Sequence, residues 1–174
     1  MTLLTPRRSP QSLDLADGGV VTVRPLERSD RAELAAAIAR LSDESRYFRF
    51  AAAKPRMTAR ELDHLVDVDH HGHEALLALD PRTGRGVAVA RYVPVPGEAG
   101  VVEIAVTVAD EWQARGLGSA LLRRLIDRAI EEGHAALRAS TLAANARSIA
   151  MLRRAGFRIR PSTGALREYE LPLV

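Results

Sequence analysis

The stretch VTVADEWQARGLGSALLRRL, residues 106–125, most constrains the fold, because a short turn with two glycines joins a strand pattern to a helix pattern. Apolar alternation up to Val108 indicates a strand, and apolar residues at helical spacing from Leu117 onward indicate an amphipathic helix. The first amides of a helix lack internal partners, and the helix dipole favours anions there. Glycines would let a phosphate group approach the backbone. The pattern predicts a strand–turn–helix unit with a candidate anion site, and an ordinary tight turn is the structural alternative.

Two nucleotide-binding motifs are excluded at this turn. A dinucleotide fingerprint requires glycine or alanine at position 121, which is Leu121, and lies near the first strand of its domain. A P-loop requires a Gly-Lys-Ser/Thr ending, which the chain lacks.

The remaining periodicity predicts one mixed α/β layer with helices on both faces. A length of 174 residues suits a single domain, expected at 19–174 after a flexible extension at 1–18. Strands are expected at 19–26, 73–80, 86–95, 98–108, 135–142, 157–160 and 167–173, and helices at 27–42, 43–50, 58–67, 117–132 and 146–155.

Composition excludes several classes of protein. The chain has no cysteine, so disulfides and cysteine-based metal or redox chemistry are absent. No apolar run approaches the length of about 20 residues that a membrane helix needs, and residues 1–19 lack the apolar core of a signal peptide. Basic residues are scattered and aromatic residues make up 4%, which argues against nucleic-acid binding. We therefore expect a cytoplasmic protein that binds neither membrane nor nucleic acid.

The surroundings of the turn carry a family resemblance. Gln113-x-x-Gly116-x-Gly118 stands between strand and helix, Asn145 follows downstream, and Ala155-Gly156-Phe157 closes the next helix. This ordered set resembles the GNAT N-acetyltransferase superfamily over residues 19–171. The resemblance implies a single GNAT-like α/β domain with a mixed, mostly antiparallel central sheet and helices on both faces. It also implies an acyl-CoA-dependent N-acetyltransferase that uses acetyl-CoA as cosubstrate.

The resemblance further implies where acetyl-CoA binds. Its pyrophosphate would lie on the turn, and its pantetheine arm would run along the strand backbone. Asn145 would lie near the cofactor, and its alternative role as a helix N-cap is compatible with that position. The implied cofactor-binding residues are Val106, Val108, Gln113, Ala114, Arg115, Gly116, Leu117, Gly118, Ser119 and Asn145.

Glu103 is the candidate general base. Strand alternation puts it on one face with Ala105 and Thr107, and it is the only carboxylate inside this apolar strand. A protonated amine must lose a proton before it can attack a thioester. The plain alternative is a surface glutamate on a solvated strand face. The position matches the general base of Pat-type bacterial protein lysine acetyltransferases, which the chain resembles, and this match favours the catalytic role.

The sequence departs from many GNAT enzymes at the general acid. Those enzymes carry a tyrosine four residues before the glycine of the closing Gly-Phe pair, where this chain has Leu152. A thiolate is a good leaving group, so solvent can protonate it. No residue is a convincing covalent nucleophile, which favours direct attack in a ternary complex.

Two further stretches have competing interpretations. Ser45–Phe50, SRYFRF, is either an aromatic helix face in the core or a wall of the acceptor pocket. Asp67–Glu74, DVDHHGHE, has the residue types of a metal site, but a solvated loop is favoured because no further ligand cluster accompanies it. Within this loop Asp69 or His70 could line the acceptor entrance. We therefore expect no metal.

The resulting hypothesis is an N-acetyltransferase that acts on a primary amine. The Pat-like features favour a protein lysine as acceptor. A small amine (polyamine, amino acid or aminoglycoside) is the alternative acceptor, and a non-catalytic acyl-CoA-binding module is the alternative function. Homodimers are common in the superfamily and would fit here.

Overall fold

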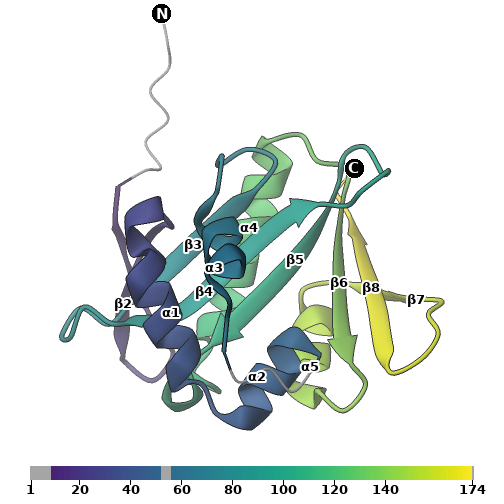
Figure 1. Ribbon diagram of the computed structural model, residues 1–174. Coiled ribbons are helices and arrows are strands. Elements are labelled where there is room, and N and C mark those ends of the chain that lie inside the picture. Colours follow the sequence, from purple (N-terminus) through teal and green to yellow (C-terminus); the bar gives the residue numbers. More distant parts are fainter. Residues whose placement is uncertain (1–8, 52–55, 174) are drawn as a thin grey trace, which may run out of the picture.

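A single eight-stranded sheet runs through the protein in the computed structural model, which describes residues 9–51 and 56–173 (Figure 1). The strand order is β1-β2-β3-β4-β5-β6-β8-β7. The strands are β1 (Gln11–Asp14), β2 (Val20–Pro25), β3 (Glu74–Leu79), β4 (Gly86–Pro94), β5 (Val101–Val108), β6 (Ala136–Leu142), β7 (Arg158–Arg160) and β8 (Leu166–Pro172). The α-helices are α1 (Arg31–Arg40), α2 (Asp43–Phe50), α3 (Ala59–Val66), α4 (Leu117–Glu131) and α5 (Ala146–Arg154). Two short 3₁₀ helices lie at Arg28–Asp30 and Asp110–Trp112.

The sheet is mixed at one place. Neighbouring strands pair antiparallel everywhere except at β5 and β6, which are parallel. Helix α4 makes the crossover between these two strands, as parallel neighbours require. The expected mixed, mostly antiparallel sheet is confirmed.

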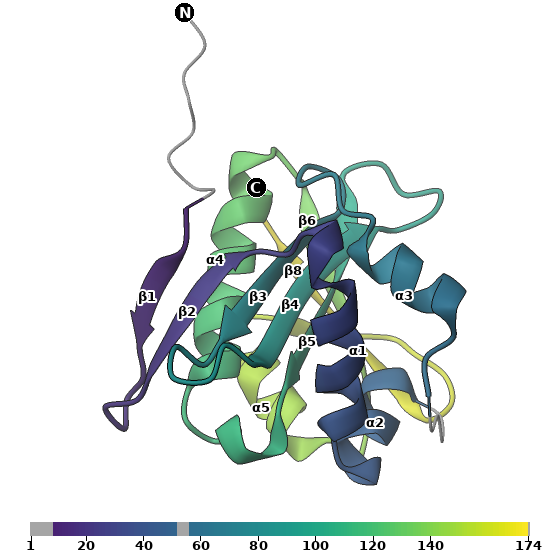
Figure 2. The same cartoon turned by 60° about the vertical axis from the view of Figure 1, so that its left-hand side comes forward.

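Helices cover both faces of the sheet, as expected, and each face has its own core (Figure 2). Leucines of α4 and Leu152 of α5 pack on one face against residues such as Val102 and Ile104 of β5. On the other face Leu34 of α1 and Val66 of α3 pack against Leu77 and its neighbours. Alternation along β5 therefore turns Val102 and Ile104 towards α4 and leaves Glu103 on the side of α1–α3.

Side-chain caps explain where three helices begin. The Ser42 hydroxyl caps α2, Thr58 forms a capping box with Glu61 at α3, and the Asn145 carboxamide accepts the Ser148 amide at α5. The predicted cap at Asn145 is confirmed, and Thr58 and Glu61 have the three-residue spacing that is typical of a capping box.

The N-terminal boundary differs from the expectation. β1 lies within residues 1–18, which the sequence suggested as an extension, and it pairs with β2 through a turn at Asp17 and Gly18. The sheet therefore begins with two strands before the helices, where one was expected. Residues 1–8 lie outside the described residues.

Among the described residues, no helix combines the length and apolar character needed to cross a bilayer. α4, with 15 residues, is shorter than the span of about 20 residues that a bilayer requires.

Candidate active site

Strand β5 loses its neighbour halfway along. It pairs with β6 only from Val101 to Ile104, although it continues to Val108 beside β4. Beyond Ala139, β6 stays paired with β8 and leaves β5. The edge of residues 105–108 that faces β6 therefore has no strand beside it. Backbone amides and carbonyls on such an edge can bind an extended chain of amide groups.

The turn after β5 presents free amides at the start of α4. Gly116 is the N-cap residue, with φ of 84°, and has no side chain to cap the helix. The first helical bond runs from the Ala120 amide to the Gly116 carbonyl, so the amides of Leu117, Gly118 and Ser119 lack a backbone partner among the described residues. By contrast, α2, α3 and α5 each have a side-chain cap at the N-terminus. The uncapped end favours an anion.

The two glycines of the motif serve different purposes. A Cβ at Gly116 would meet no atom within 4 Å, so this position opens onto free space. A Cβ at Gly118 would lie 3.3 Å from the Met151 sulfur and 3.5 Å from Val108 Cγ2. Gly118 therefore lets α4 lie close to β5 and α5, a packing reason that the sequence prediction did not include.

Gln113 links the turn to two neighbouring elements. Its amide nitrogen donates to the Val108 carbonyl and to the Ser45 hydroxyl of α2, both at 3.1 Å, and its oxygen accepts from Arg147 of α5. Asp110 strengthens the link to α2, because it accepts from Ser45 and from the backbone and hydroxyl of Ser42. The bonds of Gln113 hold the turn in place.

Arg115 is held away from the helix axis. Its guanidinium lies over the Trp112 ring, 4.3 Å from the centroid, and its Nε donates to Asp17 in the β1–β2 turn. A Cβ at Gly19 would come within 2.3 Å of Arg115 Nη2, so a side chain there would displace the end of Arg115. Arg115 thus fastens the β1–β2 hairpin to the turn, and its predicted contact with pyrophosphate stays a prediction. Ala114 stands beside it with a positive φ of 57°.

The side chain of Leu117 is buried in the core, so only its amide can face a ligand. The hydroxyl of Ser119 has no protein partner among the described residues. Asn145 caps α5, as described above, and a contact with the cofactor stays a prediction.

Glu103 lies on the face of β5 opposite α4, where it meets two residues that the sequence did not single out with it. Its Oε1 accepts the Ser140 hydroxyl of β6 at 2.9 Å. Arg49, near the end of α2, also interacts electrostatically with Glu103. Glu103 is half-buried. Ser140 could not be found from the sequence, since its contact depends on the pairing of β5 with β6.

A pocket lies between the sheet and α1–α3, and Ala105, the next residue after Glu103 on this face of β5, lines it. Its walls are mostly apolar and include Phe50, so the stretch SRYFRF contributes to a pocket wall. Two arginines line it as well. Arg49 comes from α2, and Arg91 comes from β4, where it is 6% exposed. Burial, and then the charge of Arg49, lower the pKa of Arg91 to about 10, so it stays charged at neutral pH.

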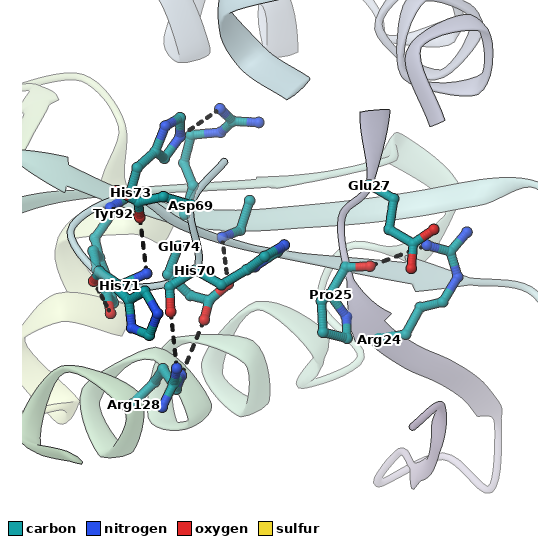
Figure 3. Close-up of polar contacts among 12 residues, drawn as sticks. Arg24, Pro25, Glu27, Asp69, His70, His71, His73, Glu74, Tyr92 and Arg128 are labelled. Carbon is teal, nitrogen blue, oxygen red and sulfur yellow. Dashed lines mark hydrogen bonds and ion pairs between the residues drawn. The ribbon is translucent and has the colours of Figure 1, made fainter. Parts of the chain in front are cut away.

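Hydrogen bonds hold the loop DVDHHGHE in place (Figure 3). The Asp69 carboxylate accepts the amides of His71 and His73, and these bonds keep its pKa below its usual range. Glu74 accepts from Arg128 of α4 and bonds to His70 Nδ1. Within residues 9–51 and 56–173, no group of three or more such side chains converges as metal ligands would.

Leu152, a residue of α5, is 3% exposed and packs in the core. An aliphatic side chain there has no proton to donate. The site therefore has no general acid at the position where many GNAT enzymes carry a tyrosine.

These features fit acetyl-CoA. The unpaired amides at the start of α4 and the open space at Gly116 suit a pyrophosphate, and the free edge of β5 suits the amide groups of a pantetheine arm. An acyl-CoA-dependent transferase has this arrangement: a free strand edge followed by a helix whose N-terminus begins at a glycine and has no side-chain cap.

Comparison with known proteins establishes the family. Residues 37–157 match the Acetyltransferase (GNAT) family, and the chain belongs to it. It is an acetyl-CoA-dependent N-acetyltransferase of GNAT type. The chain is 39% identical over 137 residues to Acetyltransferase PA5475 of Pseudomonas aeruginosa, a match that covers 78% of this chain and 72% of that protein.

The chain also resembles Pat proteins. It is 35% identical over 85 residues to Acetyltransferase Pat of Mycolicibacterium smegmatis, but that match covers 49% of this chain and only 25% of Pat. The crystal structure of the GNAT domain of S. lividans PAT superposes with a TM-score of 0.87 at 30% identity and covers 94% of this chain and 96% of that one. The structure of yncA from Salmonella typhimurium with its cofactor acetyl-CoA shares the fold, with a TM-score of 0.71 at 22% identity over 88% of this chain and 94% of that one.

Proposed function

We propose that this protein transfers the acetyl group of acetyl-CoA to a primary amine by direct attack in a ternary complex, with Glu103 as the general base. The observation that carries the proposal is the position of Glu103. Its carboxylate stands on β5 just before the strand edge becomes free, beside the pocket that Arg49 and Arg91 line. A base there is close to both the strand that would hold the thioester and the space that would hold an amine.

The cofactor would be held mainly by the backbone. The amides of 117–119 would bind the pyrophosphate, and the edge of Val106–Val108 would bind the pantetheine arm. Gln113 supports this arrangement because it fixes the turn against Val108 and α2. The chain shares its fold with yncA, which was solved with its cofactor acetyl-CoA, and this likeness supports acetyl-CoA as the ligand.

The acceptor nitrogen loses two protons in the reaction: one before it attacks, and a second, which passes to solvent, as the carbon–sulfur bond breaks. Glu103 takes the first proton from the ammonium group, directly or through a water molecule, and the Ser140 hydroxyl orients the carboxylate. Acetyl-CoA supplies the acetyl group as a thioester: the neutral amine nitrogen bonds to the carbonyl carbon, the carbon–sulfur bond breaks, and solvent protonates the thiolate that leaves. Backbone amides of the free β5 edge would polarise the carbonyl oxygen.

Two classes of acceptor are consistent with this mechanism. The likeness to Pat supports a protein lysine. A small amine is supported by a second likeness, because the chain is 38% identical over 91 residues to the L-methionine sulfoximine/L-methionine sulfone acetyltransferase of Pseudomonas aeruginosa. That match covers 51% of this chain and 52% of the relative.

The test is release of free thiol from acetyl-CoA with a panel of amines, together with calorimetry of coenzyme A binding. We expect thiol release that depends on an added amine, and an acetylated amine detectable by mass spectrometry. Tight binding of coenzyme A without turnover for any amine would instead favour a non-catalytic acyl-CoA-binding module. No heat of binding for coenzyme A would refute the proposal.

A further inference from the structure

The pocket beside Glu103 holds two arginines in apolar surroundings. Apolar side chains from α1, β4 and β5, together with Leu41, Phe50 and Leu65, form most of its wall. Arg49 and Arg91 are the charged residues in this lining. Buried or half-buried cations in an apolar wall are costly unless an anion accompanies them.

Neither arginine contacts a carboxylate within the part of the chain that the structure describes. Arg91 Nη1 donates to the Leu65 carbonyl at 3.0 Å and lies 3.4 Å from His73 Nε2. Burial, and then the charge of Arg91, hold the pKa of His73 below its usual range, so this ring is neutral at pH 7 and does not offset the arginine. Arg49 lies over the Phe50 ring, 5.0 Å from its centroid, and makes no ion pair in this part of the chain.

The two arginines also oppose one another. The charge of Arg49 helps to lower the pKa of Arg91, which means that the two guanidinium groups are close enough to repel. Burial lowers the pKa of Arg49 as well, and Glu103 only partly offsets this effect. An anion in the pocket would relieve both the burial and the repulsion.

The sheet register brings the arginines and the base within reach of one small molecule. Arg91 stands directly opposite Ala105, and Glu103 is the next residue on the same face of β5. Diagonal neighbours of this kind lie roughly 7–8 Å apart along a sheet, and long side chains shorten that separation. An acceptor amine at Glu103 would therefore have the two guanidinium groups a few bonds away.

We propose that the acceptor is a small α-amino acid with an apolar side chain, whose carboxylate is bound by Arg49 and Arg91 while its amine faces Glu103. This inference rests on the proposed function of the site. The planar guanidinium group is suited to carboxylates, which it can bind through two parallel hydrogen bonds. The side chain of the amino acid would lie against Phe50 and Leu65.

A protein lysine suits this pocket less well. Its ammonium group stands at the end of an aliphatic stem with no anion beside it, so it would bring a third positive charge to the two arginines. An α-amino acid brings its own compensating charge. The presence or absence of a carboxylate near the amine therefore decides which acceptors the experiment compares.

The experiment compares free amino acids with their amides, which differ from them only in the carboxylate, and with a lysine peptide. Thiol release from acetyl-CoA is measured with free L-leucine, L-methionine and L-phenylalanine, with their amides, and with a lysine peptide blocked at both ends. Binding of the same compounds to the coenzyme A-saturated protein is measured by calorimetry. We expect the free acids to give at least about 30-fold higher kcat/KM than their amides and than the peptide.

Variants locate the effect in the pocket. Arg49→Gln and Arg91→Met are expected to raise KM or Kd for the free acids about 30-fold while the KM for acetyl-CoA and the constants for the amides stay unchanged. Arg46→Gln is the matched control, because it removes an arginine from the same helix, where Arg46 pairs with the exposed Asp43 outside the pocket. Thermal unfolding checks that each variant folds. If Arg91→Met does not fold, Arg49→Gln alone is enough to test the carboxylate site.

The outcomes separate this inference from the proposed function. Equal use of acids and amides, or turnover of the peptide alone, would overturn the amino-acid proposal and leave the acetyltransferase intact. If no amine releases thiol, the proposed function fails instead. Binding of free acids that depends on Arg49 would then still support the carboxylate site, and its absence would overturn that site too.

Discussion

Two groups of arginines in this protein have opposite surroundings. Arg128 on α4 contacts the carboxylates of Glu74, Glu131 and Glu132 and the His70 carbonyl, and Figure 3 shows it held between Glu74 and His70. Arg49 and Arg91 line a pocket and contact no carboxylate among the described residues.

The difference separates charges that hold the fold together from charges available to a ligand. At the Arg128 corner, burial alone would lower the pKa of the arginine, but Glu74 and Glu132 raise it overall. Charge is balanced there without a ligand. In the pocket, burial lowers the pKa of both arginines, and Glu103 offsets this effect only in part and only at Arg49. We therefore expect changes in the first region to affect stability, and changes in the second to affect turnover.

The largest effect is expected in the region of the pocket, at Glu103. Glu103→Gln should lower kcat about 1,000-fold near neutral pH, or about 4 kcal/mol in activation free energy, because the amide cannot accept the proton. The affinity for coenzyme A and the thermal midpoint should stay the same. Steady-state thiol release and calorimetry measure this.

Glu168→Gln is the control for this variant, since Glu168 is an exposed glutamate of the same sheet, on β8. It should behave as wild type. Undiminished turnover in Glu103→Gln would remove Glu103 from the mechanism and weaken the contrast between the two regions.

The next largest effect is expected in the region where Arg128 is paired with carboxylates. Glu74 is 3% exposed and accepts hydrogen bonds from Arg128 and from the Ala75 amide. Glu74→Gln should lower the free energy of unfolding by about 3 kcal/mol, because a buried ion pair loses one member. Urea unfolding measures the loss. The kcat of the folded fraction should match wild type, and a stability within 0.5 kcal/mol of wild type, roughly the effect of a neutral surface change, would contradict the structural role.

A smaller effect, and a pH dependence, are expected at a second paired arginine. Arg24 donates two hydrogen bonds to the buried Asp30, and these bonds hold the pKa of Asp30 below its usual value of 3.8, although burial opposes them. Asp30→Asn should cost about 2 kcal/mol of stability at pH 7.

The sign of the pH effect follows from the lowered pKa. The carboxylate contributes its full stabilisation above pH 4, roughly the pKa of an unfolded aspartate, and loses it as the pH falls through the lower folded value. Urea unfolding of wild type and Asp30→Asn between pH 7 and pH 2.5 should show the difference shrinking below about pH 4. A difference that does not change over this range would argue against an ionic origin.

The smallest effect concerns the cofactor turn. Gly116→Ala and Gly164→Ala both add a Cβ at a positive φ, 84° and 83°, where no atom lies within 4 Å. Each should cost about 1 kcal/mol of stability. Only Gly116→Ala should weaken coenzyme A binding, about tenfold by calorimetry, because its Cβ would stand where the pyrophosphate approaches. Equal affinities for the two variants would place the pyrophosphate elsewhere.

Most of the fold could be predicted because its signals are local. Apolar periodicity marked β2–β8 and all five helices, and the predicted cap at Asn145 marked where α5 begins. β1 could not be predicted, because Gln11–Asp14 is short, mostly polar and mostly exposed, and gains its strand conformation from pairing with β2. The Asp17-Gly18 pair that precedes β2 was the one available signal for a hairpin.

The site divides in the same way. The glycine turn and the base on β5 are local patterns and were found, whereas the free edge of β5 arises only because β6 diverges after Ala139. The tie of Arg115 to Asp17 joins residues far apart in the chain, so the sequence suggested a ligand role alone. Arg91 gave one signal, a charged residue inside the apolar strand pattern GVAVARYV, which acquires meaning only when α2 brings Arg49 to the same pocket.

The gap between β5 and β6 also bears on self-association. A strand with unsatisfied backbone groups at the rim of a sheet invites pairing with another molecule and, from there, fibril growth. Here the unsatisfied stretch is interior, with β1–β4 on one side and β6–β8 on the other. A single extended chain needs only the spacing of one strand, about 4.8 Å, whereas a second folded sheet brings its neighbouring strands and covering helices with it. The unpaired backbone groups of β5 are thus available to a ligand, while the strands on either side shield them from pairing with another copy of the protein.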